Sequence, residues 1–115
     1  MSFEGIYAAY FAGKLGNSLG MFIFRDGEVS GADYGGGVYD GHYEVNQDGK
    51  TYSIDVTFVL PSESKSITGA KADSGPLKMD THFTLPRNID PDTVHELRTP
   101  IGPINARFQK IREIR

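Results

Sequence analysis

The chain has 115 residues and contains no cysteine and no tryptophan. Without cysteine it can form no disulfide, no thiolate metal site and no cysteine nucleophile. Long hydrophobic runs are missing too, so we expect no membrane as a partner. The first residues, Met1 to Gly5, have neither the basic nor the apolar region of a signal peptide. We therefore expect a cytoplasmic protein.

Positive charge is also scarce, with 12 Lys and Arg against 15 Asp and Glu and a net charge of −3. Nucleic-acid binding without sequence preference needs Lys and Arg gathered on one face. The one basic cluster is C-terminal and is interrupted by Glu113; it consists of Arg107, Lys110, Arg112 and Arg115. We therefore expect no nucleic acid as a partner.

Patterns that carry catalytic or metal chemistry are absent from the sequence. The three histidines, His42, His82 and His95, lack the close spacing of paired ligands, so a zinc site would need all three plus a carboxylate to converge in space. Gly35-Gly36-Gly37 runs into strand-like residues instead of Lys-Ser and a helix, which predicts a hairpin connection or a β-bulge and not a phosphate loop. We therefore expect no catalytic residue, no metal and no cofactor, and a protein that is not an enzyme.

Turn signals, by contrast, are frequent. The chain has 14 glycines, and both Asp26-Gly27 and Asp48-Gly49 stand between apolar runs. Asp-Gly supplies the positive φ angles of a type I′ turn, so each pair predicts a two-residue hairpin. Turn signals at intervals of about ten residues are typical of a sandwich or a barrel.

Three segments alternate between apolar and polar residues as half-buried strands do: residues 37–45, 51–60 and 77–85. In the first of these, either Val38 or Tyr39 faces inward. The large inward residues that we expect to line a cavity, or to fill it, are Tyr52, Phe58 and Phe83.

Two further strands, residues 6–11 and 19–24, are apolar on both faces. A barrel strand that faces only core and water should alternate, so something should also cover the outside of these two. A helix, a loop or a second subunit could do so, and we favour a homodimer because two-fold dimers are the commonest oligomers. The residues that we expect at the dimer interface are Tyr7, Phe11, Met21 and Ile23.

The remaining segments are less regular. Residues 62–76 predict a long loop, with a short helix or edge strand at 65–68 as alternatives, and residues 93–98 predict a short strand or a helical turn. Residues 104–114 fit a helix through Ile104, Phe108 and Ile111, and they fit a strand through Ile104, Ala106 and Phe108. We favour a strand that pairs with the first strand, because that pairing closes a barrel and removes its edges.

Together these signals predict one all-β domain over residues 1–115. We expect a small antiparallel up-and-down barrel of about eight strands, with at most one short helix.

The first half of the chain resembles a family of bacterial regulators. The matching residues are Gly5-Ile6-Tyr7, Phe11, Gly20 to Phe24, Asp26-Gly27, Gly31-Ala32-Asp33 and Tyr39 to Tyr43. The family is that of the negative regulators of type III secretion, typified by the repressor of the global regulator of the enterocyte-effacement locus. The resemblance covers residues 5 to about 60.

This resemblance implies a lipocalin-like, eight-stranded barrel that forms a dimer and sequesters a transcriptional activator without touching DNA. Family members meet the activator through an acidic surface loop. The equivalent hairpin here is Asn46-Gln47-Asp48-Gly49, in which only Asp48 is acidic, so no partner-binding residue carries over. The expected function is that of a non-enzymatic, dimeric regulatory protein that binds a protein partner. The alternative is a carrier that holds a small apolar ligand inside the barrel.

Overall fold

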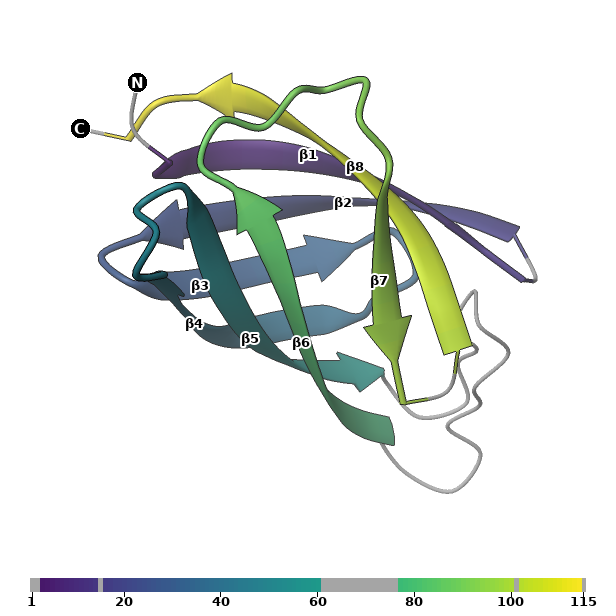
Figure 1. Ribbon diagram of the computed structural model, residues 1–115. Coiled ribbons are helices and arrows are strands. Elements are labelled where there is room, and N and C mark those ends of the chain that lie inside the picture. Colours follow the sequence, from purple (N-terminus) through teal and green to yellow (C-terminus); the bar gives the residue numbers. More distant parts are fainter. Residues whose placement is uncertain (1–2, 15, 61–76, 101, 115) are drawn as a thin grey trace.

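The computed structural model describes residues 3–14, 16–60, 77–100 and 102–114, and it shows an all-β barrel (Figure 1). No helix occurs within these ranges, and therefore none that could span a membrane. The eight strands are β1 (Gly5–Gly13), β2 (Gly16–Arg25), β3 (Glu28–Asp33), β4 (Val38–Val45), β5 (Thr51–Leu60), β6 (Leu77–Pro86), β7 (His95–Thr99) and β8 (Gly102–Arg112).

The strands form one antiparallel sheet in the order β6-β5-β4-β3-β2-β1-β8-β7. The sheet curls until its two edge strands, β6 and β7, lie near each other, and the barrel is nearly closed (Figure 1). The prediction of a C-terminal strand paired with the first strand is confirmed, since β8 pairs with β1. That pairing does not remove the sheet edges, however, because β8 also pairs with β7 and the seam falls between β6 and β7.

The alternation predicted from the sequence sets which side chains point inward. Along β5 the residues Ile54, Val56, Phe58 and Leu60 are buried, and the residues between them are partly exposed. In β4 it is Tyr39 that faces the interior, while Val38 is exposed. Of the two alternatives for residues 93–98, the short strand is the one that forms, as β7. The short helix or edge strand predicted at 65–68 lies outside the described residues.

Both predicted hairpins form, and one of them has the predicted type of turn. Asp26 and Gly27 both have positive φ, at 51° and 80°, as a type I′ turn requires. Asp48-Gly49 lies in the β4–β5 hairpin, but the two-residue type I′ turn predicted there is wrong, because only Gly49 has positive φ and the connection is the longer loop 46–50. The reason is local: the Asp48 carboxylate accepts hydrogen bonds from the backbone N–H groups of Lys50 and Thr51, which builds an Asx turn instead.

Glycine at position 41 lets the backbones of β4 and β5 approach closely. A Cβ atom there would overlap the carbonyl oxygen of Asp55 and lie 2.7 Å from the Cα of Val56. The two backbones therefore approach more closely than any side chain would permit, as they do at barrel corners.

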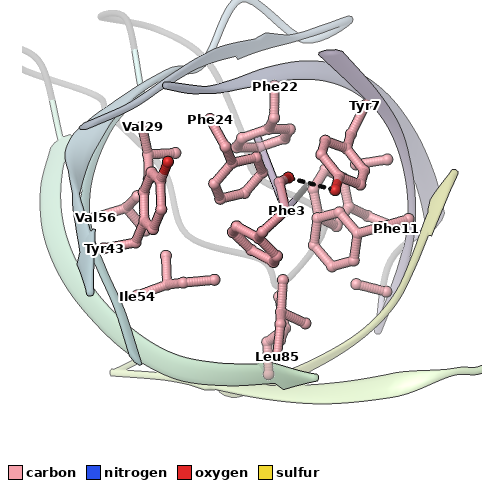
Figure 2. Packing of buried hydrophobic residues seen from close by; sticks show 14 residues of the cluster. Phe3, Tyr7, Phe11, Phe22, Phe24, Val29, Tyr43, Ile54, Val56 and Leu85 are labelled. Carbon is pink, nitrogen blue, oxygen red and sulfur yellow. Dashed lines mark hydrogen bonds between the residues drawn. The ribbon is translucent and has the colours of Figure 1, made fainter. Parts of the chain in front are cut away.

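The core closes one end of the barrel around Phe3, which precedes β1. The Phe3 ring stacks on Tyr52 at 4.0 Å between centroids and meets Phe24 edge-on at 5.0 Å. Figure 2 shows Phe3 in the middle of the barrel, with the Tyr7 hydroxyl donating a hydrogen bond of 2.6 Å to the Phe3 carbonyl oxygen. This end is therefore filled by side chains, and any internal space must lie at the other end.

Candidate functional site: an apolar cavity at the barrel mouth

A cavity of about 260 Å³ occupies the end of the barrel opposite Phe3. It lies between the ends of the strands that lead into the β1–β2, β3–β4 and β7–β8 connections. Its wall is mostly apolar, with Phe22, Phe58, Phe83 and Phe108 among the lining residues. The cavity thus combines the position and the surface of a small-molecule pocket in a barrel mouth.

The aromatic wall is packed into a connected set of rings. Tyr39 lies 4.8 Å from both Phe22 and Phe58, and Phe83 stacks on Phe108 at 6.4 Å. Each of these rings comes from a different strand and stands on an inward position. Side chains that brace one another in this way lose little freedom when a ligand arrives, so the pocket is preformed.

The rim of the cavity is polar and is organised by Asp33, the last residue of β3. The Asp33 carboxylate accepts a hydrogen bond of 2.7 Å from the Tyr39 hydroxyl and one of 2.8 Å from the Gly37 N–H. Burial raises the pKa of Tyr39, and the adjacent Asp33 charge raises it further, so this hydroxyl stays protonated as a donor. Asn17 and Ser18 of β2 lie at the same rim.

The hairpin after Asp33 explains why this carboxylate is fixed. The Asp33 N–H donates to the Gly37 carbonyl oxygen at 3.0 Å, and the Gly36 N–H donates to the Asp33 carbonyl oxygen at 3.1 Å. A Cβ at Gly37 would overlap the Phe58 ring and would lie 2.8 Å from the carboxylate, so glycine allows both to approach. Of the two alternatives predicted for the glycine run, the hairpin connection is the one that forms.

The three residues expected inside the barrel are separated by the structure. Phe58 and Phe83 line the cavity, whereas Tyr52 lies at the closed end against Phe3. Asp33 and Tyr39 were missed as site residues. The sequence left open whether Val38 or Tyr39 faces inward. The hydrogen bond between Tyr39 and Asp33 joins residues six positions apart across a hairpin, and no sequence pattern predicts it.

The four residues expected at a dimer interface are also divided. Tyr7 and Phe11 are only 3% and 7% exposed and point into the core, because β1 turns these alternate positions inward. Met21 and Ile23 are on the outside, at 47% and 43% exposure. The outer apolar face, as we name it here, consists of Ile6, Tyr10, Leu19, Met21 and Ile23 on the paired strands β1 and β2.

The histidines do not converge on one point. His82 Nδ1 lies 2.7 Å and His42 Nε2 lies 3.6 Å from the Asp55 carboxylate on the outer face of β4, β5 and β6. His95 is elsewhere, at the start of β7, with its ring 6.1 Å from that of Phe108. Among the residues that the structure describes, no group of His, Asp and Glu has the geometry of a metal site.

Comparisons of this chain with protein families, with curated proteins and with solved structures found no match.

Proposed function

We propose that this protein is a non-enzymatic binding protein that takes one small apolar molecule into the mouth of its barrel. The observation that supports this function is the aromatic cavity of about 260 Å³. An apolar cavity of roughly 150 Å³ is enough to hold benzene, so this one has room for a ligand of about two fused rings.

The test is a titration with the neutral fluorophore N-phenyl-1-naphthylamine, whose emission rises in apolar surroundings. We expect saturable binding of one probe per chain. Thr81, an inward residue of β6, lines the cavity, so Thr81→Phe places a ring in the space and should abolish binding. Thr84 is exposed on the opposite face of the same strand, so Thr84→Phe is the matched control and should bind as the native chain does.

Thermal unfolding of both variants shows whether they fold. Probe binding that survives in a folded Thr81→Phe variant would place the probe outside the cavity and would contradict the proposal. Absence of binding by the native chain, to this probe and to other neutral aromatic compounds, would do so as well.

A second function is supported by the outer apolar face. Leu19, Met21 and Ile23 are each more than two fifths exposed and lie in a row on β2, where a single subunit leaves them facing water. We propose that this face joins two copies of the chain in a dimer. The sequence resemblance supports a regulatory role for such a dimer: sequestration of a protein partner, for instance a transcriptional activator, in the cytoplasm. The two functions are compatible, because the cavity opens at the barrel mouth and the outer apolar face lies on its side.

A further inference from the structure

A negatively charged side chain lies at the mouth of the cavity. Asp33 is the one charged side chain among the described residues that line the cavity. It lies at the polar rim, whereas the deeper wall is built from aromatic and aliphatic side chains. A ligand would therefore place its apolar body inside and its polar end next to this carboxylate.

The Asp33 carboxylate still has capacity to accept hydrogen bonds. An ionised carboxylate has about four lone-pair sites. The Gly37 N–H uses one on Oδ1, and the Tyr39 hydroxyl uses one on Oδ2. Asp33 is only partly buried, which leaves room for a further donor to reach the carboxylate.

We propose that the ligand carries a hydrogen-bond donor at its polar end, and that the pocket prefers an amine to a carboxylate. This inference rests on the proposed binding function. An ammonium group would donate a charge-assisted hydrogen bond to the Asp33 carboxylate. A ligand carboxylate would be repelled by Asp33, and the described lining offers no Lys or Arg to offset that repulsion. Simple fatty acids, which end in a carboxylate, are thus poor ligands for this barrel.

The experiment compares three indoles that share a ring and differ at the end of the side chain: tryptamine, tryptophol and indole-3-acetate. Displacement of the neutral fluorophore by each compound is measured near neutral pH, so one assay ranks all three. We expect tryptamine to bind at least about ten-fold more tightly than indole-3-acetate, with tryptophol between them.

The variant Asp33→Asn removes the charge while its amide oxygen can still accept from the Gly37 N–H. Tryptamine and indole-3-acetate should then differ by less than about three-fold, with tryptophol changed least. The matched control is Asp40→Asn, which removes a charge from an exposed residue on the outer face of β4 and should leave the selectivity intact. Tyr39→Phe keeps the carboxylate and should also keep the preference for the amine.

The outcomes separate this inference from the function on which it rests. If no indole displaces the fluorophore, and the fluorophore itself does not bind, the proposed binding function fails. If the indoles bind but indole-3-acetate matches or exceeds tryptamine, the preference for an amine is wrong while the binding function stands. Equal selectivity in native protein and a folded Asp33→Asn variant would likewise overturn the role of Asp33.

Discussion

Phe3 shows how much of the fold depends on a residue outside the strands. The centroid of its ring lies 5.3 Å from that of Tyr43, and the ring stacks on Tyr52. Its carbonyl oxygen accepts a hydrogen bond from the Tyr7 hydroxyl. Burial raises the pKa of Tyr7, so this hydroxyl stays protonated and keeps donating at alkaline pH. One residue thus joins β1, β4 and β5 at the closed end of the barrel.

We predict that Phe3→Ala lowers the free energy of unfolding by about 3–5 kcal/mol, because it leaves a cavity in a packed aromatic cluster. Urea unfolding measures the change. Tyr34→Ala is the control, since Tyr34 is 90% exposed and its loss should change stability by less than about 0.5 kcal/mol. If the two variants were equally stable, Phe3 would not be the residue that closes this end.

At this scale the sequence predicts inward residues well only where a strand alternates. Phe58 and Phe83 could be placed in the interior from their phase in β5 and β6. That Tyr52 fills the closed end and does not line the cavity depends on Phe3, a residue 49 positions away that belongs to no predicted strand. Likewise, Asp33 becomes a site residue only because the hairpin folds Gly37 and Tyr39 back onto it.

Among the elements, β6 and β7 are the weakest junction of the barrel, because they are the two edges of the sheet. His95 lies at this seam, and its Nε2 is buried with no hydrogen-bond partner among the described residues. Burial lowers the pKa of His95 below its ordinary value of 6.5. The folded state therefore takes up a proton on this imidazole less readily than the unfolded chain does.

We predict that stability falls as the pH drops below about 6.5, the ordinary pKa of His, because there the unfolded state binds more protons than the folded state. The stability that His95 contributes is fully present above that pH and is lost as the pH falls through the lowered folded-state pKa. Urea unfolding across the pH range measures it.

The variant His95→Leu should remove this part of the pH dependence. The control His82→Gln replaces an exposed histidine on the outer face and should retain it. If the free energy of unfolding depended on pH identically in the native chain and in His95→Leu, protonation of His95 would not be the cause of the loss of stability.

Elements differ in how clearly the sequence predicts them, and the difference has a physical cause. The strand at residues 51–60 was predicted with the bounds of β5, because five large apolar residues alternate before Pro61 ends the run. No strand was singled out at β3, since Val29 is its one large apolar residue and Ser30, Gly31 and Ala32 give no alternation. That segment is a strand because β2 and β4 pair with it on both sides.

For the whole molecule, the outer apolar face divides the barrel exterior into two unlike sides. Apolar residues of β1 and β2 form one, and the other, on β4 to β6, carries polar residues such as Asp40, Asp80 and His82. We predict that the native chain sediments as a dimer at micromolar concentrations and that Ile23→Glu sediments as a monomer. A charge buried in the interface would face apolar side chains without a partner.

Thr84→Glu adds the same charge to the polar side and should leave the dimer intact. Analytical ultracentrifugation distinguishes the three proteins. A native chain that is a monomer would mean that the outer apolar face does not join two copies.

The architecture as a whole was predictable from the spacing of turns and from alternation, which together gave an eight-stranded antiparallel barrel. The position of the seam between β6 and β7 was not predictable, because it depends on how far the paired strands together curl the sheet. The close approach at Gly41 was not predictable either, because it follows from a contact with β5 that the local sequence does not reveal.

The pairing of β8 with β1 also has a consequence for the connectivity of the chain. It is the one ladder of the sheet that joins strands far apart in sequence, so it has the greatest loop-closure cost during folding. The two ends of the described chain lie side by side, with Ile6 opposite Arg112 (Figure 1). If those ends were linked and the chain were cut in the exposed connection between β6 and β7, the strands would run β7-β8-β1-β2-β3-β4-β5-β6. Every ladder would then join consecutive strands, and the barrel is in this sense a simple meander whose chain has been circularly permuted.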